Sequence, residues 1–339
     1  MHSKIIFIAG GAGYIGSKLI EKSLKKNYQV ICYDNLVYGK KSIKSFIKNK
    51  KFTFILGDIR DDKKIKSILQ KNSVDYVVNL ASIVGDKQCK TIPKTAYDIN
   101  YFGNQVLFNN VKKYCKNIKK YIFASTCSNY GIVLPNEFAK EDSKLSPMSL
   151  YAESKIDSEN FLKKNQSKKF DIIVLRFATA YGLSYRTRFD LTINSFTYEA
   201  IKFKKLHIFS KDTWRPFIHV DDMANIILKS FEITFKKRFS VYNAGYTKNN
   251  FSKKKIVEKI CKSIKNKIDI EYIDAVIDRR DYRVNCDKIK KDFKLSNCEN
   301  ISKAIYNLIR SIKLKKITDQ DIKNNLLDAN CATLKKFYK

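Results

Sequence analysis

The chain has 339 residues and a formal net charge of +34, and it is long enough for one large core or two joined domains. Its apolar runs are too short and too often interrupted by glycine to span a bilayer, and a strand pattern that starts at Lys4 leaves no room for a signal peptide. The eight cysteines include no Cys-x-x-Cys pair, so we predict no metal site and free thiols in a reducing, cytoplasmic compartment.

The charge comes mainly from lysine, because 57 of the 67 basic residues are Lys and ten are Arg. The lysines lie along predicted helices at positions that face solvent, and no aromatic–glycine RNA-binding signature accompanies them. We therefore expect a weak, sequence-independent attraction to polyanions at low salt, and no specific nucleic-acid partner.

The first half of the chain alternates short apolar segments with polar, Lys-rich helical segments. The apolar segments are rich in Ile, Val, Phe and Tyr on both faces, as buried parallel strands are. Strands are predicted at residues 5–9, 30–33, 53–56, 76–80, 121–125 and 172–176. This alternation predicts an α/β fold with a doubly wound parallel sheet of the Rossmann type.

The pattern loosens after about residue 180. A polar loop at 181–190 precedes a predicted helix at 191–204, short strands at 206–209 and 241–243, and helices at 253–266 and 301–312. We predict a Rossmann domain at 1–180, a smaller α/β region at 181–316 that crosses back to the Rossmann sheet, and a polar C-terminal tail at 317–339. The tail is expected to pack loosely.

Glycines recur every three residues between the first predicted strand and the first helix, at Gly10, Gly13 and Gly16. Such glycines permit a tight turn, let the backbone approach a pyrophosphate and let the helix pack closely on the strand. The phosphates would lie on the helix N-terminus, which favours anions, with Tyr14 and Ile15 in its first turn. Three glycines could also make only a sharp turn, but the strand before, the helix after and a well-placed acid argue against that interpretation.

The acid is Asp34, 18 residues after Gly16 at the end of the second predicted strand. A carboxylate there can accept both hydroxyls of an adenosine ribose and repels a 2′-phosphate. We therefore predict NAD rather than NADP as the cofactor, with Asn35 beside the acid. Asp58 and Ile59, after the third predicted strand, are placed to hold the adenine by a polar and an apolar contact.

Tyr151 and Lys155 stand four residues apart in "YAESK", so a helix would place them on one face. One interpretation is a buried ring beside a lysine whose stem packs on apolar surface. The other is a phenol whose pKa a neighbouring ammonium lowers, which suits a general acid or base. The spacing alone does not decide between the two.

Ten short segments, in a fixed order along the chain, help to decide between a packing role and an acid–base role for Tyr151. They are GGAGYIG, Asp34, GDI, NLAS (79–82), Asn100, STCSNYG (125–131), YAESK, LRFATAYG (175–182), RPFIHVDD (215–222) and DRRDYRV (278–284). Together they resemble the extended short-chain dehydrogenase/reductase family, whose members act mainly on nucleotide-activated sugars. The resemblance covers roughly residues 4–315.

The resemblance implies roles for individual residues. Tyr151 would exchange a proton with a sugar hydroxyl, Lys155 would lower the pKa of that phenol and bind the nicotinamide ribose, and Thr126 would hydrogen-bond the reacting oxygen. Arg215 and Arg280 would grip the substrate diphosphate, because a planar guanidinium meets phosphate oxygens bidentately. The implied cofactor residues also include Leu80, Ala81, Ser82, Asn100 and Phe177, and the implied substrate residues also include Thr126, Thr179 and Asn194.

Two positions depart from the family's 4,6-dehydratases, which carry Asp-Glu directly after the catalytic Thr. Cys127 and Ser128 stand there and cannot do that acid–base work, so dehydration is disfavoured. The stretches 79–90, 188–200 and 278–289 most resemble a branch that includes GDP-manno-heptose 4-dehydrogenases of bacterial surface-polysaccharide pathways.

The resemblance therefore implies an NAD-dependent enzyme that oxidises carbon 4 of a nucleoside-diphosphate sugar, as a 4-dehydrogenase or a 4-epimerase. A GDP-linked heptose or hexose is the expected substrate, and a homodimer is expected by analogy with the family. The alternative is a non-catalytic NAD-sensing or RNA-binding relative of the same fold. The intact set of Thr126, Tyr151 and Lys155 argues against that alternative.

Overall fold

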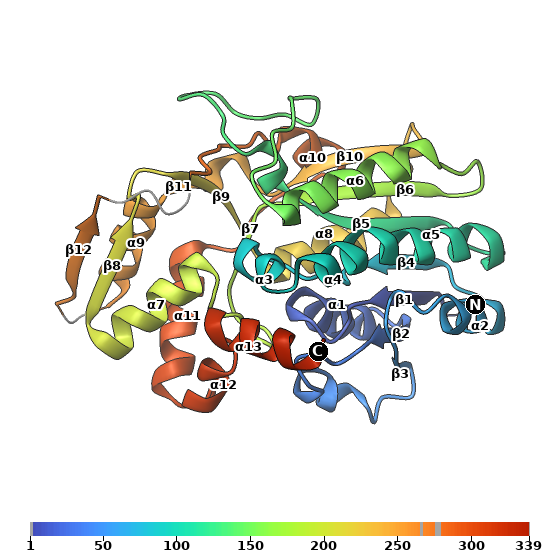
Figure 1. Cartoon of the computed structure of the whole chain (residues 1–339), viewed down its shortest axis with the longest axis horizontal. Coiled ribbons are helices and arrows are strands. Elements are labelled where there is room, and N and C mark those ends of the chain that lie inside the picture. The colour runs from blue at the N-terminus through green and yellow to red at the C-terminus, as the bar shows by residue number, and fades with distance from the viewer. Residues whose placement is uncertain (1–2, 265–266, 275–278, 339) are drawn as a thin grey trace.

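Seven parallel strands form the central sheet within the residues that the computed structural model describes, which are 3–264, 267–274 and 279–338 (Figure 1). Their order across the sheet is β10-β6-β5-β4-β1-β2-β3. The strands are β1 (Ile5–Ala9), β2 (Gln29–Asp34), β3 (Phe52–Leu56), β4 (Tyr76–Asn79), β5 (Lys120–Thr126), β6 (Asp171–Phe177) and β10 (Phe239–Ala244). This is the predicted Rossmann sheet. Its strand order reverses at β1, and ligands bind beyond the carboxyl ends of the strands at such a point.

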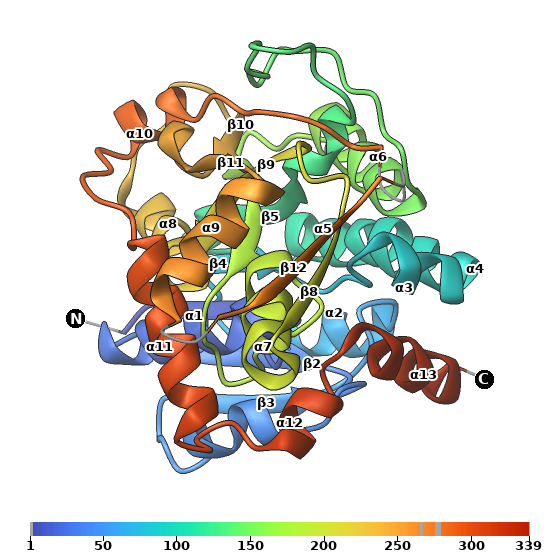
Figure 2. The same cartoon turned by 90° about the vertical axis from the view of Figure 1, so that its left-hand side faces the viewer.

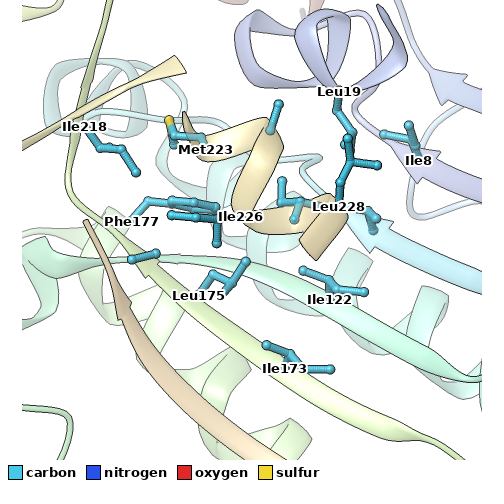
Figure 3. Packing of buried hydrophobic residues seen from close by; sticks show 14 of the residues in the cluster. Ile8, Leu19, Ile122, Ile173, Leu175, Phe177, Ile218, Met223, Ile226 and Leu228 are labelled. Atoms are coloured by element: carbon cyan, nitrogen blue, oxygen red, sulfur yellow. The ribbon is translucent and has the colours of Figure 1, made fainter. Parts of the chain in front are cut away.

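Helices cover both faces of the sheet because each strand is apolar on both sides. In β1, Ile6 and Ile8 face one core and Phe7 and Ala9 face the other. Figure 3 shows the first core, in which Leu228 packs with apolar side chains from the sheet and from the neighbouring helix. Helices α1 (Tyr14–Lys25) and α8 (Val220–Glu232) cover that face, and α2 (Asp62–Lys71), α5 (Gly103–Tyr114) and α6 (Leu150–Lys164) cover the other.

Short helical segments connect these elements. They are α3 (Asp86–Thr91), α4 (Pro93–Tyr97), the π-helical turn η2 (Asp98–Phe102) and the 3₁₀ turns η1 (Lys41–Phe46), η3 (Cys127–Tyr130) and η4 (Thr247–Asn249). Among the described residues, no helix is both long enough and apolar enough to cross a bilayer.

The second half of the chain builds two small sheets beside the large one. Strands β7 (Thr179–Tyr181), β9 (Trp214–His219) and β11 (Asn250–Ser252) form one sheet, and β8 (Lys205–Phe209) and β12 (Asp269–Ile273) form the other. Helices α7 (Thr192–Phe203), α9 (Lys253–Ser263) and α11 (Ile301–Lys313) accompany them (Figure 2), whereas α10 (Asp287–Asp292) packs beside β10 of the large sheet. The helices predicted at 191–204 and 301–312 agree with α7 and α11. Of the helix predicted at 253–266, residues 265–266 lie outside the described residues.

The prediction of a loosely packed tail is wrong. The tail folds into α12 (Asp319–Lys323) and α13 (Leu327–Phe337), and α13 packs beside α3 (Figure 1). Leu334 is completely buried in the core that faces α2, α5 and α6. The apolar positions Leu327, Cys331 and Leu334 follow helical spacing, but they are too few among polar neighbours to stand out in the sequence.

A buried ion pair fixes α6 to the sheet. Arg176 of β6 and Glu159 of α6 are 5% and 4% exposed, and the Nη2 of Arg176 lies 2.7 Å from the Oε2 of Glu159. The Nε of Arg176 donates to both carboxylate oxygens at 3.1 Å. The same carboxylate accepts hydrogen bonds from the Asn129 amide at 3.0 Å and from the Ser125 hydroxyl of β5. One carboxylate thus joins β5, β6 and α6.

Glu159→Leu should lower the free energy of unfolding by about 3–5 kcal/mol, because it leaves Arg176 as a buried charge without its partner. Urea unfolding followed by circular dichroism measures the change. The double variant Glu159→Leu/Arg176→Met should regain much of the loss, since both charges are then gone. Glu258→Gln, which breaks an exposed pair with Lys255 on α9, should leave the midpoint unchanged. A fully stable Glu159→Leu protein would contradict the role given to this pair.

Candidate active site

One cavity of about 630 Å³ receives nearly all of the predicted site residues. Its size is typical of sites that bind small molecules and cofactors. It opens at the carboxyl ends of the central strands and continues between the large sheet and the second region. The predicted residues that line it are Gly10, Gly13, Tyr14, Ile15, Gly16, Asp34, Asn35, Asp58, Ile59, Leu80, Ala81, Ser82, Thr126, Tyr151, Lys155, Phe177, Thr179, Arg215 and Arg280.

The glycine-rich turn is closely packed against its neighbours. Gly10 has a φ of +78°, and a Cβ built on it would lie 2.6 Å from the backbone nitrogen of Ala81. A Cβ on Gly16 would lie 2.5 Å from the carbonyl oxygen of Gly10. Neither position accepts a side chain, so the backbone itself forms the cavity wall where α1 begins. The N–H groups of a helix N-terminus bind phosphate at such a wall.

Asp34 is held at the end of β2 by two backbone donors. Its Oδ2 accepts from the N–H of Ala12 at 3.0 Å, and its Oδ1 accepts from the N–H of Leu36 at 2.8 Å. Burial raises the pKa of the carboxyl group, and these two bonds act in the opposite direction. Each carboxylate oxygen has more than one acceptor site, so Asp34 can still accept hydroxyl groups from a ribose in the cavity.

The residues after β2 and β3 are already bonded within the protein. The side chain of Asp58 accepts from the Nε of Arg60 at 2.8 Å and from its Nη2 at 2.9 Å. The amide of Asn35 donates to the hydroxyl of Tyr338 at 2.7 Å. Both residues border the cavity, and together with Ile59 they form the wall where an adenine is expected.

Thr126, Tyr151 and Lys155 all line the cavity. Thr126 ends β5, and its Oγ1 lies 2.8 Å from the hydroxyl of Ser128. Ser149 caps α6 by accepting from the N–H of Ala152 at 3.2 Å, so Tyr151 lies in the first turn. The Nζ of Lys155 lies 5.8 Å from the ring centre of Tyr151, which places the two side chains together.

The predicted lowering of the Tyr151 pKa is not what the protein alone produces. Burial raises the pKa of this phenol, and the nearby charge of Arg188 only partly opposes the increase. Burial also lowers the pKa of Lys155 to about 8. The sequence spacing shows that the two residues are neighbours, but it does not show how far both are removed from water, and desolvation is the larger effect here.

Asn100 and Asn194 were predicted to bind cofactor and substrate, and neither lines the cavity. The Oδ1 of Asn100 accepts from Ile83 N–H at 2.8 Å, and its amide donates to the hydroxyl of Ser154 at 3.2 Å. Asn100 therefore ties the turn after β4 to α6. Asn194 is completely buried and accepts from Gly182 N–H at 3.0 Å. The amide groups of both residues are used within the protein, so their roles are to position the backbone around the site.

Arginines occupy the second region's side of the cavity. Arg215 of β9 donates from Nη1 to the carbonyl of Trp214 at 2.7 Å, and its guanidinium lies 5.0 Å from the ring centre of Tyr282. Arg280 and Tyr282 also line the cavity. Guanidinium groups on a cavity wall suit a diphosphate.

Several residues of the cavity wall were not predicted from the sequence. They are Arg186 and Arg188 from the polar loop after β7, Tyr282, and Leu327, Asn330 and Tyr338 from the tail. The scarcity of arginine was a usable signal, because four of the chain's ten arginines line the cavity, whereas three of its 57 lysines do. Arg188 forms a bidentate pair with Asp190, at 2.7 and 3.0 Å.

Two buried lysines, Lys120 and Lys155, differ in the hydrogen bonds that their ammonium groups make. Burial lowers the pKa of both Lys120 and Lys155 to about 8. The Nζ of Lys120 donates to three carbonyls at the end of α8, those of Ser230, Phe231 and Ile233. The Nζ of Lys155 has no hydrogen-bond partner within the described part of the chain, and it borders the cavity. Lys155 thus lacks the partners that a purely structural buried lysine has.

Lys120→Met should lower the free energy of unfolding by about 1–3 kcal/mol, because it leaves buried carbonyls without their donor. Lys155→Met should not lower it, because it removes a buried charge and costs no bond within the protein. Urea unfolding of the ligand-free proteins compares the two variants. Equal losses of stability would mean that Lys155 is structural.

Comparison with known proteins shows relatives over most of the chain. A UDP-glucuronate 4-epimerase of Thermodesulfobacterium geofontis is 29% identical over 332 residues, which cover 91% of this chain and 98% of the relative. The structure of a dTDP-glucose 4,6-dehydratase from Bacillus anthracis in complex with NAD has a TM-score of 0.79 at 25% identity and covers 93% of this chain and 98% of its own.

A second solved structure has the same fold. It is a UDP-glucuronic acid 4-epimerase from Bacillus cereus in complex with UDP-glucuronic acid and NAD, with a TM-score of 0.78 at 25% identity, covering 91% of this chain and 99% of its own. The family model for NAD-dependent epimerases and dehydratases matches residues 6–245, which include the glycine-rich turn, Thr126, Tyr151 and Lys155. The chain belongs to the NAD-dependent epimerase/dehydratase family.

Proposed function

We propose that this protein uses NAD to oxidise carbon 4 of a nucleoside-diphosphate sugar. The observation that carries the proposal is that one cavity is lined by the glycine-rich turn, Asp34, the set of Thr126, Tyr151 and Lys155, and a group of arginines. Residues 1–180 would bind the dinucleotide and supply the catalytic groups, and residues 181–316 would bind the nucleotide sugar. A homodimer remains a prediction from the family.

The residues present fit NAD. The turn from Gly10 to Gly16 would hold the phosphates, and Asp34 would accept the adenosine ribose hydroxyls. Lys155, whose Nζ has no hydrogen-bond partner among the described residues, would donate to the nicotinamide ribose. Bound NAD would supply the hydride acceptor, and its positively charged nicotinamide ring would favour the Tyr151 phenolate over the neutral phenol.

The protein's own groups would handle the proton. The phenolate of Tyr151 would take the proton from the carbon 4 hydroxyl while the hydrogen on carbon 4 leaves as hydride, so the C–O bond becomes a carbonyl. Thr126 would hydrogen-bond the reacting oxygen. The site is shielded from water, so the Tyr151 phenolate and the Lys155 ammonium lie in a medium of low dielectric constant. Their electrostatic interactions are stronger there than in water.

Dehydration receives no support from the residues after Thr126. Cys127 is 1% exposed, it does not line the cavity, and its thiol donates to the carbonyl of Arg176 at 3.0 Å. Burial holds the pKa of that thiol far above its ordinary value. Ser128 borders the cavity but has no proton to exchange near neutral pH. The proposal is therefore a 4-epimerase, if hydride returns to the same sugar, or a 4-dehydrogenase, if hydride leaves.

The identity of the nucleotide that carries the sugar remains a prediction. The relatives named above act on UDP- and dTDP-linked sugars, whereas the sequence resemblance favours a GDP-linked heptose or hexose. A panel of UDP-, dTDP- and GDP-sugars, mixed one by one with the NAD-loaded protein, identifies the substrate by the absorbance of NADH at 340 nm in a single turnover. A protein that binds NAD, forms no NADH and converts no member of the panel to its 4-epimer would favour the non-catalytic alternative.

Tyr151→Phe should slow sugar oxidation by about 10²–10⁴-fold, the usual effect of losing a positioned acid–base group, because it keeps the ring and removes the proton-carrying oxygen. Single-turnover NADH formation measures the rate. Tyr306→Phe, on the exposed face of α11, is the matched control and should react as the wild type does. A Tyr151→Phe protein with the wild-type rate would mean that Tyr151 serves packing alone.

Asp34→Ala should narrow the preference for NAD over NADP, because the carboxylate that repels a 2′-phosphate is removed. Titration calorimetry with each cofactor on both proteins measures the preference. Equal affinities of the wild type for NAD and NADP would contradict the role given to Asp34.

A further inference from the structure

Arg186 is a partly buried cation on the cavity wall, and no acid among the described residues forms an ion pair with it. Its guanidinium carbon lies 3.6 Å from the ring centre of Tyr38, and its Nη2 donates to the Oδ1 of Asn330 at 2.8 Å. Its Nε is buried and has no hydrogen-bond partner within the described chain. Burial lowers the pKa of the group to about 10. A buried charge with an unused donor is costly to the protein unless a ligand completes it.

The nearest carboxylates are already bonded to other groups. Asp190 forms the bidentate pair with Arg188 and also accepts from the Gln88 amide at 2.8 Å. Asp34 accepts from two backbone N–H groups. Among the described residues, no ion pair joins Arg186 to either of them or to any other acid. The described acids therefore leave Arg186 without an ion pair, and an anionic ligand in the cavity would supply one.

The loop that carries Arg186 is bonded to the first turn of α1. The hydroxyl of Tyr14 donates to the carbonyl of Gly182 at 2.6 Å, and the hydroxyl of Ser184 donates to the carbonyl of Tyr14 at 2.6 Å. The hydroxyls of Ser17 and Ser184 are 3.0 Å apart. Arg186 thus stands on a loop anchored to the helix N-terminus at which the glycine-rich turn would hold phosphate.

The C-terminal helix holds Arg186 in this position. Asn330 of α13 is 1% exposed and accepts from the guanidinium. Tyr338, directly after α13, bonds to Asn35 beside Asp34, and Asp328 pairs with Lys87 of α3 at 2.6 Å. Figure 1 shows α13 lying beside α3, with the C-terminus near the loops that follow the first strands. The tail therefore closes the adenosine end of the cavity.

We propose that Arg186 binds the diphosphate of the dinucleotide, and that α13 positions it through Asn330, so that the tail is a part of the cofactor site. The inference rests on the proposed function, since it takes NAD as the ligand of the cavity. Arg186 would supply the charge that the glycine-rich turn lacks. The Tyr38 ring and Asn330 hold the guanidinium, and its Nε remains available to donate to a phosphate oxygen.

Titration calorimetry with NAD and with ADP-ribose tests the role of Arg186. Arg186→Gln should weaken both ligands by the same factor, at least about tenfold, because both carry the diphosphate and a charge-assisted hydrogen bond is lost. Arg310→Gln, at an exposed position on α11, is the control and should bind as the wild type does. Unchanged affinities, or a loss confined to NAD, would overturn the assignment. Circular dichroism confirms that the variants are folded.

A double-mutant cycle tests the role of Asn330. Asn330→Leu should weaken NAD in the wild-type background and have no further effect in the Arg186→Gln background, because Asn330 acts through Arg186. Equal losses in both backgrounds would overturn the positioning role of α13. A wild-type protein that binds neither NAD nor ADP-ribose would instead refute the proposed function, so the two failures can be told apart.

Discussion

The carboxylate of Glu159 joins three elements at once, and the arrangement of the site depends on it. It pairs with Arg176 on β6, accepts from Ser125 on β5 and lies one helical turn beyond Lys155 on α6. Ser125 directly precedes Thr126. The single buried pair therefore sets the distance between the strand that carries Thr126 and the helix that carries Tyr151 and Lys155. Such geometry has to be fixed closely, because small displacements of reacting groups cost much of the rate.

Lysine and arginine occupy different parts of this protein, and the difference bears on what the protein binds. Lysine covers the exposed helices, where any cation keeps the chain soluble. Arginine is scarce and is concentrated at the cavity, where a planar fork of donors can be held by rings and carbonyls. The high net charge thus says little about the ligand, and the positions of a few guanidinium groups say much more.

Much of the large sheet could be predicted from the sequence, because strands buried on both faces need continuous apolar runs. The strand predicted at 5–9 agrees with β1, and most of the predicted site residues line one cavity. The short strands β7, β9, β11 and β12 could not be assigned, since their pairing depends on contacts between distant segments. Asn194 shows a second limit: a motif identifies a residue, but not whether its amide is already used by Gly182 and Arg188. The pKa of Tyr151 shows a third, because spacing does not reveal desolvation.

The tail illustrates how function can depend on a segment with little signal in the sequence. Its apolar residues are few, yet Leu334 is completely buried and Asn330 and Tyr338 reach the cavity wall. The tail lies outside the matched family segment, 6–245. A site described from that segment alone would leave out one side of its wall.

Transfer of deuterium from carbon 4 to NAD tests whether hydride moves directly between sugar and cofactor. The substrate found in the sugar panel is prepared with deuterium on carbon 4, mixed with the NAD-loaded protein, quenched within one turnover and analysed by mass spectrometry. The account predicts that the label appears in the reduced cofactor and that none is lost to water, because hydride moves directly between carbon 4 and NAD. Label released to the solvent, or a reduced cofactor that carries no label, would contradict it.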